Sequence, residues 1–296
     1  MSPANLLRLI TLAALWGASF LFLRIAVPSL GPAVVIEARV GTAAIFLSLV
    51  GLAMGRSLHW RSHWRHYALL GGLNAALPFV LLAYAAQTLP ASILAILNAT
   101  TLAFGALAMA VWTRAWPTPR LIAGLVVGMV GVGIVLGIDT FALPGAGLAV
   151  AACLGATASY GAASAYTKFA AGDDAFASAH GSMWASTIMV LPLALAFPAP
   201  ALPAQNVLLA VLGLGILSTG IAYLIYFRLV TEVGPASALT VTFLIPVFGV
   251  LWGVLFLGET VGWNTFAGAA VVLAGTALVA GVRLPRTMSR SASSRS

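Results

Sequence analysis

Apolar residues run through the chain in ten stretches, each long enough to cross a membrane as a helix. A bilayer core of about 30 Å needs about 20 helical residues. No stretch alternates apolar and polar residues as a barrel strand would, and unpaired backbone groups are costly in lipid. The pattern therefore predicts an all-α integral membrane protein with ten transmembrane helices, at residues 6–27, 33–54, 67–86, 91–112, 121–138, 147–169, 176–197, 207–230, 236–257 and 265–282.

The second five stretches repeat the first five at an offset of 144 residues. Trp16 falls on Tyr160, and Arg24 falls on Lys168. Further matches are Gly71 with Gly215, Phe104-Gly105 with Phe248-Gly249, and, after a slip of one residue, Pro90-Ala91-Ser92 with Pro235-Ala236-Ser237. A unit of five helices crosses the bilayer an odd number of times, so its second copy must be inverted.

This pattern predicts a first five-helix repeat over residues 1–140 and an inverted second repeat over residues 145–282. Inverted repeats are typical of secondary transporters, whose substrate site lies between the halves. We expect one central cavity, lined by the first, third, fourth, sixth, eighth and ninth helices.

Composition and charge agree with a lipid environment. Hydrophobic residues make up 61% of the chain and charged residues only 7%, against about 25% charged in a soluble domain. The net charge of +8 lies in short loops and at the C-terminus, where it indicates topology rather than nucleic-acid binding. All basic loops fall on one side, which predicts a multi-pass protein of the cytoplasmic (inner) membrane with both termini and a basic tail, residues 283–296, in the cytoplasm.

Polar and aromatic side chains within the stretches are few, and they are the candidates for substrate contact. The Asn98 amide both donates and accepts hydrogen bonds, which suits a zwitterion. Each proline inside a helix frees a backbone carbonyl. The candidate substrate-binding residues are Trp16, Asn74, Pro78, Asn98, Thr101, Tyr160, Ser164, Tyr223, Thr242 and Pro246. Core packing, hydrogen bonds between helices and static kinks are the competing explanations for these residues.

Ionisable residues inside a membrane helix are costly and therefore point to function. Glu37 is the one carboxylate close to the interior of an apolar stretch, so it is the candidate for proton coupling; a helix cap is the alternative role. Arg24 could extend toward the headgroups, and Arg39 could pair with a carbonyl or with Glu37.

The sequence predicts no enzyme, no cofactor and no metal site. Catalysis within the membrane needs a nucleophile with a base, or paired carboxylates, and no histidine or acidic pair falls at the centre of a stretch. His59, His63 and His66 have a metal-like spacing, but a solvated basic loop is the preferred interpretation. Cys153 is the only cysteine and cannot form a disulfide within the chain.

Short motifs in a fixed order carry a resemblance to a known family. They are Leu15-Trp16-Gly17-Ala18-Ser19-Phe20, Glu37-Ala38-Arg39, Asn98-Ala99-Thr100, Pro246 and Leu257-Gly258-Glu259. Through them the chain resembles the EamA-type, ten-helix members of the drug/metabolite transporter superfamily over residues 6–282, and it is similar to their aromatic amino acid exporters. Two positions depart from that pattern: Leu102 stands where a proline is expected, and Thr113-Arg114 where Gly-Glu is expected.

The resemblance implies export of amino acids or related metabolites by alternating access. With few fixed charges and many apolar walls, the expected cavity suits a small zwitterion with an apolar side chain. Because only Glu37 is placed to relay protons, facilitated diffusion or exchange is expected. The alternative is a flippase for lipids or lipid-linked metabolites, which would expose a groove to lipid. The expected partners are a small-molecule substrate and membrane lipid, not nucleic acid.

Overall fold

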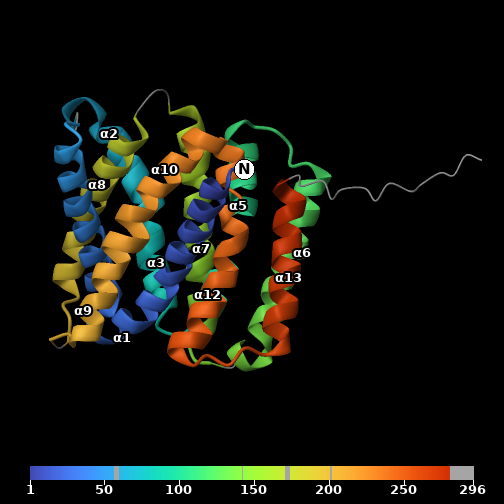
Figure 1. Cartoon of the computed structure of the whole chain (residues 1–296). Coiled ribbons are helices and arrows are strands. Elements are labelled where there is room, and N and C mark those ends of the chain that lie inside the picture. Colours follow the sequence, from blue (N-terminus) through green and yellow to red (C-terminus); the bar gives the residue numbers. More distant parts are fainter. Residues whose placement is uncertain (57–59, 142, 171–173, 201, 281–296) are drawn as a thin grey trace, which may run out of the picture.

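All regular elements that the computed structural model describes are helical, over residues 1–56, 60–141, 143–170, 174–200 and 202–280 (Figure 1). The first half contains α1 (Pro3–Ala53), α2 (Trp60–Gly71), the π-helical η1 (Gly72–Ala76), α3 (Leu77–Ala85), α4 (Ala91–Asn98), α5 (Thr101–Trp112) and α6 (Pro119–Phe141). The second half contains α7 (Ala146–Phe169), α8 (Ala175–Ala196), α9 (Gln205–Leu212), the π-helical η2 (Gly213–Ile221), α10 (Ala222–Val233), α11 (Pro235–Ala238), α12 (Val241–Leu257) and α13 (Trp263–Ala280).

The prediction of an all-helical membrane protein is confirmed at this level. Among the described residues, eight helical segments are long and apolar enough to cross a membrane, and α12 is a shorter apolar helix. Large apolar side chains on the outside, such as Leu209, Leu255 and Phe256, are exposed as a lipid-facing surface requires. The predicted basic tail, residues 283–296, lies outside the described residues.

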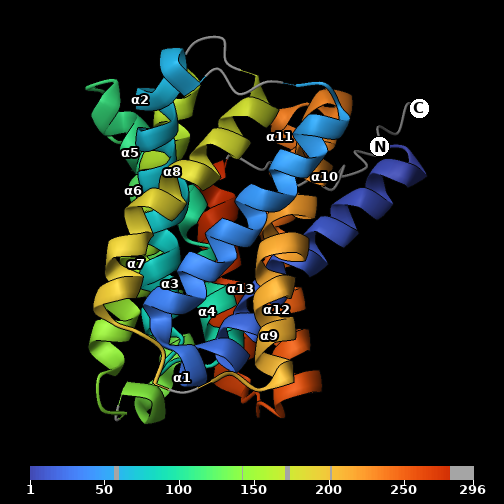
Figure 2. The same ribbon diagram turned by 90° about the vertical axis from the view of Figure 1, so that its left-hand side faces the viewer.

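Helix α1 is a hairpin of two helices rather than one rod. Gly31 interrupts it with φ 74° and ψ 160°, between Pro28 and Pro32. Positive φ favours glycine, and proline cannot continue a helix without losing a hydrogen bond. In Figures 1 and 2 the dark-blue first part runs away from the N-terminus and the lighter-blue second part returns toward that end. The break falls between the first two predicted stretches.

Contacts between helices recur at the 144-residue offset with the two halves exchanged. A Cβ on Gly17 would lie 2.7 Å from the Cβ of Phe248, and a Cβ on Gly161 would lie 2.6 Å from the carbonyl carbon of Phe104. Gly161 is the counterpart of Gly17, and Phe104 is the counterpart of Phe248. The same backbone contact is therefore made twice, as an approximate two-fold axis between the halves requires.

Helices α6 and α13 show the direction of that symmetry. Gly124 packs against Gly275, and Gly131 packs against Gly268. Residue numbers rise along one helix as they fall along the other, so the two helices are antiparallel, as Figure 1 shows. Glycines allow such close approach between membrane helices. Since these are the last helices of the two halves, the halves run in opposite directions.

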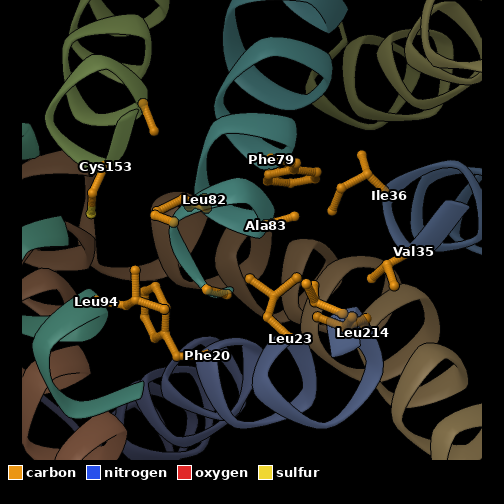
Figure 3. Packing of buried hydrophobic residues seen from close by; sticks show 14 of the residues in the cluster. Phe20, Leu23, Val35, Ile36, Phe79, Leu82, Ala83, Leu94, Cys153 and Leu214 are labelled. Carbon is orange, nitrogen blue, oxygen red and sulfur yellow. The ribbon is translucent and has the colours of Figure 1, made fainter. Parts of the chain in front are cut away.

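The main apolar cluster runs from the end where α1 turns to Leu47 and Phe176 near the opposite end. It includes Leu30 and Leu89 at the end where α1 turns, and Figure 3 shows Phe20, Leu82 and Leu94 of the same cluster gathered between α1, α3 and α4. A smaller cluster at the opposite end joins α1 with α10 and α12. Residues of both clusters, among them Phe20, Leu82 and Val241, also line the cavity described below.

Candidate functional site

A cavity of about 240 Å³ occupies the centre of the molecule. Its described lining comes from the six expected stretches and also from the second part of α1, through Arg39. The lining residues are Trp16, Ser19, Phe20, Leu23, Arg39, Asn74, Phe79, Leu82, Asn98, Thr101, Tyr160, Ser164, Ser218, Thr219, Tyr223, Tyr226, Leu239, Val241, Thr242 and Ile245.

Equivalent positions of the two halves line this cavity. The lining contains the pairs Trp16 with Tyr160, Asn74 with Ser218, Phe79 with Tyr223, and Asn98 with Thr242, each separated by 144 residues. The π-helical segments η1 and η2 also fall at corresponding places and contribute Asn74 and Ser218. Such π-helical turns are frequent at functional sites. The cavity therefore lies at the interface between the halves.

The structure places eight of the ten candidate residues in the cavity wall: Trp16, Asn74, Asn98, Thr101, Tyr160, Ser164, Tyr223 and Thr242. Pro78 and Pro246 are buried and are not among the described residues that line a cavity. Whether the eight lining residues contact a substrate stays a prediction.

Most polar side chains of the wall already have partners. The Asn74 amide donates to the Tyr223 hydroxyl at 3.1 Å, and the Ser218 hydroxyl donates to the Leu15 carbonyl at 2.7 Å. The hydroxyls of Thr101 and Thr242 donate to the backbone carbonyls three residues earlier, those of Asn98 and Leu239. The Asn98 Oδ1 differs, because it is buried and has no hydrogen-bond partner among the described residues. It remains available to a ligand.

Arg39 is the charged residue of the cavity wall that the sequence alone did not place there. Its side chain is 4% exposed. Its Nε donates to the Thr219 hydroxyl at 3.1 Å, and its guanidinium carbon lies 3.6 Å from the centre of the Phe79 ring. The sequence contained one signal for this placement, because Arg39 is an ionisable residue inside an apolar stretch.

The expected pairing of Arg39 with Glu37 or with a carbonyl is absent from the contacts of the described residues. Two residues along a helix are separated by about 200° around its axis, so the two side chains leave α1 in different directions. Glu37 is not among the described lining residues, and its Oε2 is buried without a partner.

A second cavity of about 320 Å³ continues the first toward the end of the molecule that carries the N-terminus. The two share Asn74, Ser164, Tyr223 and Tyr226. Its wall also includes His66, which is half-buried in α2 and bonded to the hydroxyls of Tyr166 and Ser178, at 2.9 and 3.1 Å. The expectation of a solvated loop is therefore wrong for His66, because three helices meet around it.

The opposite end is closed by a contact between the halves. The Glu259 carboxylate accepts from the backbone N–H groups of Ala91 and Ser92, at 2.6 and 3.0 Å. These are the first residues of α4, where helical N–H groups lack partners within the helix and a negative charge is favourable. Together with the main apolar cluster, this contact separates the cavity from that end.

Comparisons with known proteins agree with this geometry. The sequence model of the EamA-like transporter family matches twice, over residues 5–137 and 147–281, once in each half. A solved structure titled "Crystal structure of protein" is 19% identical, with a TM-score of 0.65, and the match covers 94% of this chain and 98% of that chain. The two proteins therefore share a fold. No curated protein matches the chain.

Proposed function

Because the chain belongs to the EamA-like transporter family, we propose that it is a secondary transporter that exports amino acids or related small metabolites across the cytoplasmic membrane. Members of this family are multi-pass membrane transporters of small metabolites. The observation that carries the proposal is the central cavity, which lies between two oppositely directed halves and is lined by equivalent positions of both. Substrate sites of inverted-repeat transporters occupy this place.

In the proposed topology the chain crosses the membrane ten times. The two parts of α1 on either side of Gly31 make the first two crossings, and α12 belongs to the ninth. At the end with the N-terminus α1 and α7 end and α6 begins, and Arg56, Lys168 and Arg120 lie at or next to those helix ends in the sequence. Basic loops face the cytoplasm, so this end is assigned to the cytoplasm and the Glu259 end to the opposite side.

Alternating access follows from this orientation. The cavity continues toward the cytoplasmic end, and the Glu259 contact closes the other end. Substrate would enter from the cytoplasm, and its release would require α12 and α4 to separate. The described lining contains no carboxylate, and Glu37 lies elsewhere, which favours facilitated diffusion or exchange over proton coupling.

The size of the cavity favours a small metabolite. Drug-sized ligands occupy pockets of about 300–1,000 Å³, and the central cavity measures about 240 Å³. Aromatic and aliphatic side chains, including Trp16, Phe20 and Leu82, make up much of the wall. A small zwitterion with an apolar side chain fits this combination.

The proposal is tested by counterflow in liposomes that contain the purified protein. Vesicles preloaded with a mixture of unlabelled amino acids should accumulate external radiolabelled phenylalanine or leucine, and protein-free vesicles should not. An imposed proton gradient should cause no uphill accumulation, either in the wild type or in Glu37→Gln. Accumulation that disappears in Glu37→Gln would make Glu37 a coupling residue. If no counterflow occurred and the protein scrambled a fluorescent lipid, the transporter proposal would be wrong and the flippase alternative would take its place.

A further inference from the structure

Arg39 is the only charged side chain among the described residues that line the central cavity. The ion pairs of the described residues join Arg8 with Glu232, Arg228 with Glu232, and Arg56 with Asp174, and none includes Arg39. A buried charge without an opposite charge is costly. The cavity therefore holds a positive charge that no acidic side chain of the described residues neutralises.

The guanidinium is held in one orientation, with most of its donors still free. Its Nε donates to the Thr219 hydroxyl, and the position of that hydroxyl is fixed in turn because it donates to the Leu214 carbonyl at 2.8 Å. Phe79 covers one face of the guanidinium, and the edge of Phe79 in turn meets the Tyr160 ring, with 6.4 Å between ring centres. Arginine has five N–H donors in a planar fork, and the protein contacts described here use one.

Free terminal N–H groups in a fixed plane match the two oxygens of a carboxylate. Because the guanidinium is already oriented, binding such a group would cost little further ordering. The cavity also holds an unsatisfied acceptor, the Asn98 Oδ1. An α-amino acid carries both a carboxylate and an ammonium group, so it could satisfy both sites.

The other half of the protein does not duplicate this charge. The position equivalent to Arg39 is Met183, which is fully buried and is not among the described lining residues. The cationic site therefore occurs once in a cavity whose described lining contains seven pairs of equivalent positions. A substrate would be bound in one orientation, with its charged end at Arg39.

We propose that Arg39 binds the carboxylate of the transported metabolite and makes the cavity selective for carboxylates over otherwise identical amides and amines. This inference rests on the proposed transport function for its substrate, but binding can be measured separately from transport.

The test is direct binding to the purified full-length protein in detergent, by isothermal titration calorimetry. The probes are L-phenylalanine, 3-phenylpropanoate and L-phenylalaninamide, which separate the carboxylate from the ammonium group. The two carboxylates should bind the wild type at least about thirtyfold more tightly than the amide, since leaving a charge unpaired is expensive.

Variants then assign the selectivity to Arg39. Arg39→Met, which copies the residue of the other half, should weaken both carboxylates by about thirtyfold or more and leave the amide within about threefold. Arg39→Lys should retain part of the preference, because an ammonium is a point charge without the planar fork. Arg24→Met is the matched control: Arg24 also lies in α1 but donates to the Ala86 carbonyl and does not line the cavity. Its selectivity should equal that of the wild type.

Several results would overturn the inference. Equal binding of amide and carboxylate to the wild type, or no binding of any probe, would do so. So would an Arg39→Lys protein that loses thermal stability while keeping the full preference, because Arg39 would then be structural. Displacement of L-phenylalanine by phosphatidylglycerol and not by 3-phenylpropanoate would assign Arg39 to a lipid phosphate.

Flux measurements separate this inference from the proposed function. If L-phenylalaninamide underwent counterflow as fast as L-phenylalanine, the proposed transport function would stand and the proposed carboxylate site would be wrong. If carboxylates bound selectively but no counterflow occurred, the proposed carboxylate site would stand and the proposed transport function would be wrong.

Discussion

The segment α4–α5 and its counterpart α11–α12 occupy equivalent places in the two halves, but their ends are held differently. Glu259, just after α12, accepts hydrogen bonds from the first N–H groups of α4. At the 144-residue offset the counterpart of Glu259 is Ala115, one residue after the Thr113-Arg114 position where the family pattern expects Gly-Glu, and it has no carboxylate to offer to α11. We call the contact of Glu259 with the first N–H groups of α4 the clamp. The repeated backbone thus has a clamp at one end of the molecule only, and the cavity continues toward the other end. The two-fold backbone supplies the shape, and side chains that differ between the halves determine which end is closed.

The largest expected effect comes from removing the clamp. Glu259→Ala leaves the Ala91 and Ser92 N–H groups without their charged acceptor, and hydrogen bonds to charged groups contribute about 1.5–3 kcal/mol each. We expect the free energy of unfolding to fall by about 3 kcal/mol, measured by circular dichroism during thermal unfolding in detergent. Glu259→Gln should have a smaller effect, because an uncharged amide oxygen still accepts.

Opening at that end provides a second readout of the same change. In a Cys153→Ala background, Ser92→Cys should react slowly with a membrane-impermeant maleimide, because Ser92 is 5% exposed. Adding Glu259→Gln should increase the labelling rate. An unchanged rate would show that the apolar cluster closes this end without the carboxylate.

The next largest effect concerns a place where the two halves do not differ. A Cβ on Gly131 would lie 2.6 Å from the Val272 nitrogen, and a Cβ on Gly275 would lie 2.6 Å from the Gly128 nitrogen. Gly131→Ala and Gly275→Ala should therefore each lower the free energy of unfolding by a similar amount, about 1–3 kcal/mol, as overpacking typically does. Gly133→Ala is the control, since no atom lies within 4 Å of its added Cβ. Clearly unequal effects of the two variants would argue against the two-fold relationship of α6 and α13.

A smaller difference is expected between two equivalent cavity residues. The Asn98 Oδ1 has no partner in the described part of the chain, and the Thr242 hydroxyl donates to the Leu239 carbonyl of its own segment. A hydrogen bond to substrate contributes about 0.5–1.5 kcal/mol, so Asn98→Ala should slow counterflow by about threefold to tenfold, at equal amounts of reconstituted protein. Thr242→Ala should change it by less than about twofold. The reverse order would place the substrate nearer the second half.

The smallest effect is expected where the helices end. Gly258 after α12 has φ 63°, and its counterpart Arg114 after α5 has φ 51°. Glycine adopts positive φ without strain, whereas other residues do so at a cost of about 1–2 kcal/mol. Arg114→Gly should therefore raise the free energy of unfolding by up to about 1 kcal/mol, and Gly258→Ala should lower it by a similar amount. Stabilisation by both changes would contradict this explanation.

The sequence by itself determined the helical membrane fold and the internal repeat. Hydrophobic length is a property of consecutive residues, and a repeat is a property of spacing, so both can be read along the chain. Glycines that recur at the offset mark the close contacts of α6 with α13. The break at Gly31 follows in the same way from two prolines that flank a glycine.

Only the tertiary structure decided which side chains meet. Arg39 lines the cavity and Glu37 does not, since each residue rotates a side chain by about 100° around its helix. Pro78 and Pro246 are buried but are not among the described lining residues. Glu259 reaches residues more than 160 positions earlier, and no local pattern encodes such a contact. Rotation about a helix axis and contact between distant segments depend on packing, which is fixed only when all the helices are assembled.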